Sequence, residues 1–584
     1  MDFFSVLTLI GGLALFLYGM DVMGDGLKKL SGSKLEIILS KLTSNRFKGF
    51  LLGFLVTAVI QSSSATTVML VGFVNSGIMN LGQTMSTIMG ANVGTTVTSW
   101  LLSLSGISGE SFFVRILKPT SFTPILAAIG ILLHMMAKTD KKKYIGSILL
   151  GFAVLMFGMD TMSGAVSGLK DSPEFARILV MFQNPVMGIL AGTILTAIIQ
   201  SSSASVGILQ ALALTGTISF STAFPIILGQ NIGTTITPIL SAINGNTDSK
   251  RVAFSCLYIK ILGVLAVTIP FYLITGFVDF SYSDNIMTPA TIAIIHTLFN
   301  IVSTIVLLPF CNQIERLATI TIRKKAGEKA TDVFDTLDER FLSVPGFAVE
   351  KCRELVCQMA EITRKSIMDA VGLLTRYDED ISKEVQKSED AVDMYEDKIS
   401  TYLVHLASQD LSDNESREVT KLLHVIGDVE RISDHAVNII RAAKEIDEKG
   451  MTFSQNAQRE IRTITEAVCE ILTITTKALV DENIELAKHV EPLEQIIDKL
   501  RSKIKAGHIR RLQEGRCTVE QGFVLSDLLH DCERVSDHCS NIAVCILEIA
   551  NNSFETHEYL SHVKNDGENE FFERYAVYKE KYNI

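Results

Sequence analysis

The chain has 584 residues, of which 47% are hydrophobic and 20% are charged. Residues 1–330 contain 22 basic and 14 acidic side chains, whereas residues 331–584 contain 31 basic and 50 acidic ones, so the net charges are +8 and −19. This division excludes a wholly soluble and a wholly membrane-embedded protein, and it predicts a membrane domain followed by an acidic soluble domain. Nine cysteines without a Cys-x-x-Cys pair exclude a disulfide-rich secreted fold, and the acidic balance argues against a nucleic-acid partner.

The first predicted element is an apolar helix over Phe3–Met20. It has neither a basic leader nor a small-residue cleavage site, so we expect it to be retained as a membrane helix. The loop that follows carries six basic residues against three acidic ones, counted from Asp21 to Lys48. The positive-inside rule therefore places this loop, with Lys34 and Lys41, in the cytoplasm and the N-terminus outside.

The membrane half contains a repeat with a constant offset of 139 residues. Gln61-Ser62-Ser63-Ser64 recurs as Gln200-Ser201-Ser202-Ser203, and the segment Gly90–Thr96 recurs as Gly229–Thr235. Leu17–Asp21 recurs, with substitutions, at the same offset. Units of this length are longer than solenoid repeats and are typical of a transporter core.

The distribution of charge indicates that the two copies enter the membrane from opposite sides. The loop of the second copy, with Lys170 and Arg177, has a net charge of −1, and we expect it outside. Lys138 and Lys141–Lys143 place the junction between the copies inside. The sequence therefore predicts an inverted repeat.

Two runs, residues 49–109 and 178–247, contain no charged side chain but many hydroxyls and amides. Unpaired polar groups in hydrocarbon cost several kcal/mol each, so these groups must face protein, water or a ligand. About a dozen apolar residues flank each Gln-Ser-Ser-Ser motif, too few for two full spans. We expect a re-entrant helical hairpin with the motif near its tip.

The segments Gly90–Thr96 and Gly229–Thr235 each contain two glycines four residues apart. Such glycines can pack membrane helices closely, or they can mark a broken helix whose freed backbone binds an ion. Their duplication beside the Gln-Ser-Ser-Ser motifs favours a broken helix with a binding role.

The expected ligands are a small oxyanion and Na⁺. Hydroxyls, amide nitrogens and helix N-termini donate hydrogen bonds to an oxyanion. The uncharged runs supply no buried Lys or Arg, so a co-bound cation would neutralise the anion, and hydroxyl and carbonyl oxygens suit Na⁺.

These residues resemble the bacterial Na⁺/phosphate cotransporter family, which is marked by paired inverted Gln-Ser-Ser-Ser repeats. The resemblance covers about residues 1–315 and includes His296–Asn300. It leaves His296 open as a ligand or a packing residue. It implies that phosphate and Na⁺ bind at Gln61, Ser62, Ser63, Ser64, Asn92, Thr95, Thr96, Gln200, Ser201, Ser202, Ser203, Asn231, Thr234 and Thr235.

Residues 344–552 have the pattern of six amphipathic helices, with a turn near Gly450. The segment Asp428–His435 recurs as Asp531–His538 with an offset of 103. Glu389 and Asp393 recur as a second Glu/Asp pair with an offset of 105. Because carboxylates four residues apart share a helix face, these pairs predict cages for hard metal ions.

This half resembles PhoU-like domains, which have two three-helix bundles that can hold metal clusters. The resemblance implies possible transition-metal ligands at Glu389, Asp393, Glu430, Asp434, Glu494, Asp498, Glu533 and Asp537. His435 and His538 stay open as residues that support the ligands or pack the core.

The predicted fold is all-α: a polytopic membrane domain of two inverted repeats with re-entrant hairpins, and a cytoplasmic pair of three-helix bundles. The expected divisions are repeat 1 (1–139), repeat 2 (140–320), a linker (321–343), the PhoU-like domain (344–552) and a tail (553–584). We expect a location in the bacterial cytoplasmic membrane, with lipid as a partner and a homo-oligomer or regulatory partner as further possibilities.

The predicted function is Na⁺-coupled phosphate uptake by alternating access, regulated by the cytoplasmic domain, and not enzymatic. A membrane phosphate sensor with little flux is the alternative. A metal-dependent phosphatase is a third class, but nothing in the sequence singles out a nucleophile or an open metal position.

Overall fold

The computed structural model describes residues 3–31, 45–107, 118–168, 173–277, 282–324, 332–551 and 569–583. Lys34, Lys41 and Lys170, which enter the orientation argument, lie outside these ranges, as do residues 553–568 of the tail. The described residues form helices joined by short connections and no β-strand, apart from one isolated bridge between Ser219 and Ile286. The predicted all-helical fold is confirmed. The chain divides into two compact units, Met1–Val344 and Pro345–Ile584.

Six helical stretches of the first unit are long and apolar enough to cross a membrane. They identify a multi-pass membrane protein. These candidate spans are Phe3–Ser31, Pro119–Met136, Asp140–Val166, Phe220–Ser241, Thr247–Thr275 and Pro289–Thr321.

The helices of the first unit repeat with the offset seen in the sequence. The first copy contains α1 (Phe3–Ser31), α3 (Arg46–Ile60), α4 (Ser63–Asn75), α5 (Leu81–Gly94) and α6 (Thr96–Ser103). The second contains α9 (Asp140–Val166), α11 (Pro185–Ile199), α12 (Ser202–Ala213), α13 (Phe220–Gly233) and α14 (Ile236–Ser241). Both ends of α11 and of α13 lie 139 residues after those of α3 and α5. The sequence repeat is thus a repeat of helix boundaries.

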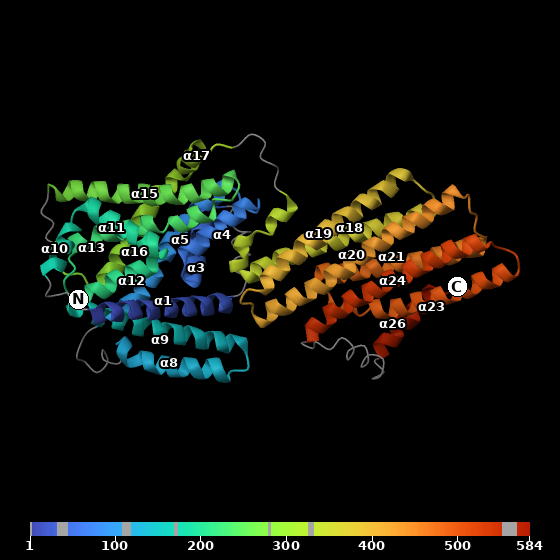
Figure 1. Cartoon of the computed structure of the whole chain (residues 1–584), viewed down its shortest axis with the longest axis horizontal. Helices are drawn as coiled ribbons and strands as arrows, with labels where there is room; N and C mark the ends of the chain where they lie inside the picture. The colour runs from blue at the N-terminus through green and yellow to red at the C-terminus, as the bar shows by residue number, and fades with distance from the viewer. Residues whose placement is uncertain are drawn as a thin grey trace. The chain divides into compact units, whose positions relative to one another are not determined.

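The equivalent helices α1 and α9 pack antiparallel against each other, as Figure 1 shows. Gly12 lies against Gly158, and Gly19 lies against Gly151. Gly151 and Gly158 are the residues 139 positions after Gly12 and Gly19. Exchanging the two copies therefore converts one of these contacts into the other. This reciprocity is the mark of a two-fold axis between the two helices.

The remaining helices of the first unit are α8 (Pro119–Met136), α10 (Pro173–Met181), α15 (Thr247–Thr275), α16 (Pro289–Leu307) and α17 (Cys311–Thr321). Helix α15 contacts α4 and α5 of the first copy and α13 of the second. Beyond α17, the segment that precedes the second unit packs on α4: Phe341 is fully buried, and its ring centroid lies 5.4 Å from that of Phe73.

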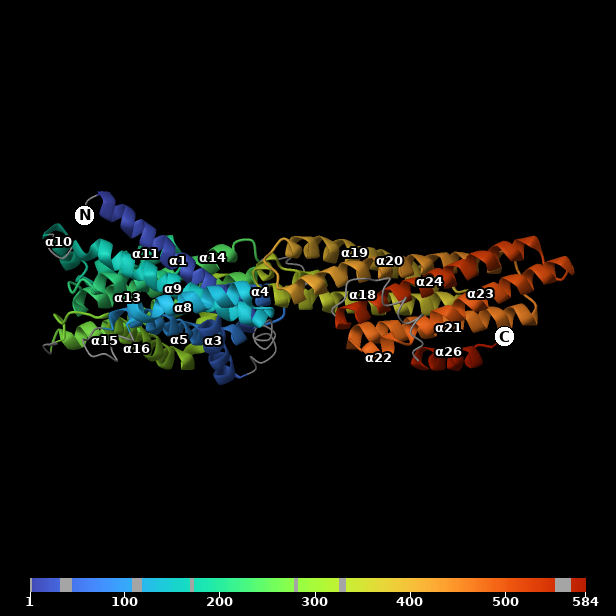
Figure 2. The same ribbon diagram turned by 90° about the horizontal axis from the view of Figure 1, so that it is seen from below.

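The second unit consists of two three-helix bundles (Figure 2). The first is formed by α18 (Pro345–Leu373), α19 (Glu379–Ala407) and α20 (Asp413–Glu448), and the second by α21 (Gln455–Asp481), α23 (Val490–Gln513) and α24 (Val519–Asn551). The bundles meet mainly through α20 and α24. A short helix, α22 (Ile484–Ala487), connects α21 to α23.

A C-terminal helix, α26 (Asn569–Lys581), packs against the second bundle (Figure 2). Phe571 is buried there, and Lys581 forms an ion pair of 2.8 Å with Glu470 of α21. The Tyr578 hydroxyl lies 3.2 Å from Nδ1 of His489. The aromatic residues of the tail therefore attach it to the bundle.

Candidate functional site

The first Gln-Ser-Ser-Ser motif forms the break between α3 and α4. Gln61 ends α3 with φ 60° and ψ 18°. Residues other than glycine adopt this left-handed backbone conformation at a cost of about 1–3 kcal/mol. Ser62 then caps α4, because its hydroxyl accepts a hydrogen bond of 3.2 Å from the Ala65 N–H. Across the break, Thr57 donates to Thr66 at 3.0 Å. The chain therefore folds back at the motif.

The second motif has the same backbone conformation. Gln200 ends α11 with φ 59° and ψ 17°, and Ser201 caps α12 by accepting from the Ala204 N–H at 3.2 Å. Among the described non-glycine residues, positive φ values occur at Gln61, Gln200 and Glu482. Two of these three strained positions are thus equivalent glutamines, which makes the paired break a specific feature of the fold.

The side chains of the two motifs differ. Gln61 is 7% exposed, and its Oε1 accepts a hydrogen bond of 2.8 Å from Thr98, whereas Gln200 is exposed. The residues that correspond to Thr57, Thr66 and Thr98 are Thr196, Ser205 and Thr237. Within the described part of the chain, the buried hydroxyls of these three residues have no hydrogen-bond partner. The polar side chains around the first motif therefore hydrogen-bond with one another, whereas the equivalent hydroxyls around the second motif do not.

The broken helix predicted at Gly90–Thr96 and Gly229–Thr235 is present as a short interruption, at Thr95 between α5 and α6 and at Thr234 and Thr235 between α13 and α14, but the backbone there is not unwound. Only Thr95 separates α5 from α6, and its φ of −58° and ψ of −27° are still helical. The glycines instead let neighbouring helices approach closely: Gly90 faces the carbonyl of Phe50, and in the second copy Gly229 faces that of Ile189.

The threonines after these glycines bond to their own helix. Thr95 donates to the Ala91 carbonyl at 3.0 Å and Thr96 to that of Val93 at 2.7 Å. Thr234 and Thr235 donate in the same way within the second copy. Their oxygens keep acceptor capacity for a cation. Buried residues of the predicted set are Gln61, Ser63, Asn92, Thr95, Thr96, Ser202, Ser203, Asn231, Thr234 and Thr235; Ser62, Ser64 and Ser201 are half-buried.

The structure brings a lysine, which the sequence analysis missed, to this polar region. The Lys260 ammonium on α15 donates to Oδ1 of Asn231 at 3.1 Å, and both residues are buried. The expectation that this region lacks a buried basic residue is therefore wrong, because Lys260 lies outside the two uncharged runs in the sequence. The available signal was the position of Lys260 as the one charged residue between Val252 and Thr275.

His296 is buried on α16, and its Nδ1 lies 2.8 Å from the Ser99 hydroxyl of α6. Asn300, one turn later, donates to the His296 carbonyl at 2.8 Å. These contacts give His296 a packing role in joining α16 to the first copy.

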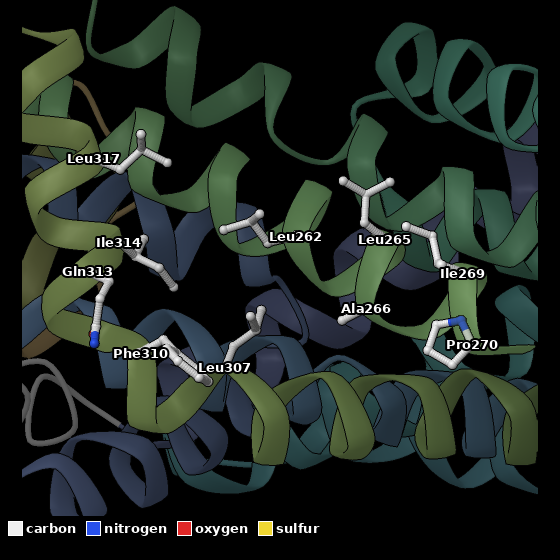
Figure 3. A pocket seen from close by; sticks show the side chains of 10 residues that line it. All are labelled: Leu262, Leu265, Ala266, Ile269, Pro270, Leu307, Phe310, Gln313, Ile314 and Leu317. Atoms are coloured by element: carbon white, nitrogen blue, oxygen red, sulfur yellow. The ribbon is translucent and has the colours of Figure 1, made fainter.

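A pocket of about 660 Å³ between α15, α16 and α17 is chemically unlike these motifs (Figure 3). Its lining is apolar except for Gln313, and it includes Leu262, Ile269 and Phe310. Such a surface lacks the donors that an oxyanion needs.

In the second unit, carboxylates converge in each bundle. Ligand oxygens of Glu389, Asp393 and Asp434 lie within 4.8 Å of one another. In the equivalent group, Glu494, Asp498 and Asp537, the ligand oxygens also lie within 4.8 Å of one another. Three hard oxygen donors in each group fit a divalent or trivalent metal ion.

Repulsion accompanies this convergence. Partial burial, together with the nearby charge of Asp434, raises the pKa of Asp393. In the second group, burial and then the charge of Asp537 raise the pKa of Asp498. A bound cation would relieve both effects, so the donor sets fit a metal.

Glu430 and Glu533 lie outside the converged oxygens. Glu533 instead forms an ion pair with Arg501. Glu430 lies one turn before Asp434 on α20, and burial and the charge of Asp434 raise the pKa of Glu430.

Two histidines join the bundles reciprocally. Nδ1 of His435 on α20 lies 2.8 Å from Oδ1 of Asp531 on α24, and His538 makes the equivalent contact with Asp428, also at 2.8 Å. The imidazole rings of the two histidines stack with centroids 5.9 Å apart. Both side chains therefore pair with aspartates of the opposite bundle.

Comparisons with known proteins match both units. A family model described as Na⁺/Pi-cotransporter matches residues 15–164 and 170–278, and one described as PhoU domain matches residues 356–443 and 461–546. The matches cover both motifs and both carboxylate groups.

Curated relatives match in the same pattern. The "Putative inorganic phosphate export protein YjbB" of Escherichia coli (strain K12) is 23% identical over 93% of this chain and 98% of its own length. YqeW of Bacillus subtilis, an uncharacterised protein, is 32% identical over 53% of this chain and 96% of its own length. Sodium-dependent phosphate transport protein 2A of Rattus norvegicus is 27% identical over 30% of this chain and 26% of its own length. The chain belongs to the Na⁺/phosphate cotransporter family and carries a C-terminal PhoU domain.

Proposed function

We propose that the first unit carries inorganic phosphate across the membrane by alternating access, coupled to Na⁺, and that the second unit regulates this transport. The observation that carries the proposal is the pair of equivalent breaks at Gln61 and Gln200, each followed by a serine-capped helix. Family membership supports phosphate as the substrate.

The breaks provide donors for an oxyanion. The first turn of a helix leaves backbone N–H groups unpaired and carries a partial positive charge, and a capping hydroxyl satisfies one of these groups. Helices α4 and α12 both begin at a motif, within protein regions that contain no acidic residue. In this proposal, phosphate binds at these N-termini with Ser63 and Ser202 as further donors.

The hairpins are proposed to be re-entrant. Both ends of the first one lie near the same set of segments: Arg46, which begins α3, donates to Asn312 of α17 at 2.7 Å, and Asn75, which ends α4, accepts from the Asn246 N–H at 2.9 Å. Arg251 on α15 donates to Ile322, just after α17. Helices of 15 and 13 residues are also too short to span a bilayer core of about 30 Å.

The two copies are proposed to be inverted in the bilayer. The reciprocal contact of Gly12 and Gly19 with the equivalent glycines of α9 supports a two-fold axis across the helices. If the helices cross the membrane, this axis lies in the membrane plane. The basic ends of α1 and α3 then face the cytoplasm and the N-terminus faces outside.

The proposed Na⁺ coupling rests on unpaired oxygens. The hydroxyls of Thr196, Ser205 and Thr237 are buried without a hydrogen-bond partner among the described residues. Unpaired hydroxyl oxygens are costly, and a cation with oxygen preference would satisfy them. In the opposite state of the alternating-access cycle, the two copies would exchange these roles. The hydroxyls around the second motif would then be hydrogen-bonded, and those around the first would be unpaired.

Proteoliposomes that contain the full chain test the proposal. We expect an inward Na⁺ gradient to drive uptake of labelled phosphate, and replacement of Na⁺ by K⁺ to abolish it. Phosphate binding without flux would favour a sensor and contradict transport. Uptake at the same rate in K⁺ as in Na⁺ would contradict the Na⁺ coupling but not the transport of phosphate.

Phosphate export is a second candidate, favoured by the name of the full-length relative YjbB. An alternating-access carrier runs in either direction, because the gradients set the net flux. Vesicles preloaded with phosphate and Na⁺ test export. Efflux at a low internal phosphate concentration, with much weaker uptake under the reversed gradients, would assign export as the working direction.

We further propose that the second unit binds metal ions at Glu389, Asp393 and Asp434 and at the equivalent group. Mn²⁺ at 100 times its dissociation constant is expected to stabilise the folded unit by about 2.7 kcal/mol. Asp434→Asn with Asp537→Asn should abolish this shift and the metal that co-purifies with the full chain. Thermal unfolding and elemental analysis are the measurements. Asp447→Asn, an exposed change on the same helix as Asp434, is the control.

The metal-free protein should show a defined pH dependence. The pKa of folded Asp393 is raised above its ordinary value of 3.8, so the folded state binds protons more tightly than the unfolded state. Stability is therefore expected to fall as pH rises from 3.8 through the raised pKa. An Asp434→Asn variant should reduce this loss. If the stability of the metal-free protein instead rises with pH over this range, repulsion between the carboxylates is contradicted.

A further inference from the structure

Lys260 is a charged residue in the middle of α15, within an apolar stretch of that helix. Between Val252 and Thr275 no other residue is charged, and the helix has the composition of a membrane span. Lys260 lies 13 residues after the start of the helix and 15 before its end, which is about 20 Å from either end at 1.5 Å per residue. A lysine side chain cannot reach the membrane surface over that distance.

Among the residues that the structure describes, the ammonium group of Lys260 has one hydrogen-bond partner, which is neutral. Its Nζ donates to Asn231 Oδ1 at 3.1 Å, and the Asn231 amide is held in this orientation because its Nδ2 donates to the Ile227 carbonyl at 3.0 Å. Lys260 is 6% exposed. Among the described residues, no carboxylate lies within ion-pair distance of its ammonium group. A buried ammonium bonded only to an amide oxygen is an uncompensated charge that stabilises an anion placed beside it.

The position of Lys260 connects the two copies. Asn231 belongs to α13 of the second copy, whose neighbouring residue Gln230 donates to the Ser205 carbonyl at 3.0 Å, within the second hairpin. One turn before Lys260, the buried Cys256 lies beside Thr67 of the first hairpin, on α4, which packs against α15. Thr67 in turn donates to the carbonyl of Ser63, in the first motif, at 2.9 Å. Lys260 thus lies on the helix that contacts both duplicated motifs.

We infer that Lys260 binds the transported oxyanion directly and supplies the fixed positive charge that neutralises it. This inference rests on the proposed function and extends it, because it assigns the recognition of substrate charge to a residue outside both repeated motifs. The two ammonium protons that do not bond to Asn231 are the donors. The residue that corresponds to Lys260 in the first copy is Ser121, so the charge is present once and breaks the symmetry of the paired motifs.

Lys260→Met keeps the length of the side chain and removes its charge. In proteoliposomes it is expected to raise the KM for phosphate at least about tenfold, the effect of losing one charge-assisted hydrogen bond, with a smaller change in kcat. Lys260→Arg should restore the KM to within a few-fold of wild type. Lys250→Met, at the membrane-surface end of the same helix, is the control and should leave the KM unchanged.

Asn231→Asp gives a second test, which also serves if the Met variant does not fold. A carboxylate beside Lys260 would neutralise the ammonium internally. We therefore expect the phosphate-free protein to unfold at a higher temperature and the KM for phosphate to rise at least about tenfold. A purely structural lysine would show the stabilisation without the rise in KM.

The outcomes separate this inference from the proposed function. Phosphate transport with an unchanged KM in Lys260→Met overturns the role of Lys260 and leaves the function intact. If the wild type neither transports nor binds phosphate, the proposed function is contradicted. Thermal unfolding in the presence of sulfate then tests whether Lys260 binds an oxyanion. Stabilisation of the wild type, but not of Lys260→Met, by sulfate supports the inference; equal responses overturn it.

Discussion

Replacing Gly90 or Gly229 by alanine is expected to abolish folded protein at physiological temperature. A Cβ atom at Gly90 would lie 1.9 Å from the Phe50 carbonyl oxygen, and one at Gly229 would lie 2.0 Å from that of Ile189. These contacts are with backbone, which cannot rotate away, so α3 must separate from α5, and α11 from α13. Overpacking of this kind costs about 1–3 kcal/mol in ordinary cores and more where only backbone can move.

The measurements are the fraction of monodisperse protein after detergent extraction and its midpoint of thermal unfolding. Gly11→Ala and Gly164→Ala are matched controls in α1 and α9, because an added Cβ there meets nothing within 4 Å. We expect both controls to behave as wild type. If Gly90→Ala and Gly229→Ala unfold at the wild-type temperature, the close packing of these helix pairs is incorrect.

The sequence predicted the helical architecture well where a pattern occurred twice. The common offset located Gln61 and Gln200, and the structure gives them nearly the same φ and ψ. Apolar periodicity predicted the six long helices of the two bundles, and the paired carboxylates Glu389 and Asp393 do converge with Asp434. Local spacing is sufficient for such features, because residues four apart share a helix face.

Features that depend on packing between distant segments could not be predicted. The glycine spacing in Gly90–Thr96 predicts the helix break but not the close contact with α3, which lies about forty residues earlier in the chain. Lys260 reaches Asn231 only because α15 crosses both copies. The resemblance to PhoU-like domains implies Glu533 as a metal ligand, yet Glu533 forms an ion pair with Arg501 of the neighbouring helix α23.

The hydroxyls of Ser63 and Ser202 are expected to contribute separately measurable affinity for phosphate. Each residue begins a helix at its motif and is buried. Removing a hydroxyl that donates to an anion should weaken binding by about 1.5–3 kcal/mol, which raises the KM roughly ten- to a hundredfold. Ser76→Ala, at the opposite end of α4, removes a buried hydroxyl that bonds only to the Gly72 carbonyl and is the control.

The double variant distinguishes one shared site from two. If Ser63 and Ser202 contact the same phosphate ion, their effects on the free energy of binding should be coupled by about 0.5 kcal/mol or more, because loss of one contact lets the ion shift from the other. Additive effects would indicate that the two hairpins bind at independent sites. Uptake with unchanged affinity in both single variants would contradict phosphate binding at the motifs. The charge of Lys260 would then have to act without the paired helix N-termini, and the duplicated left-handed glutamines would require a purely structural cause.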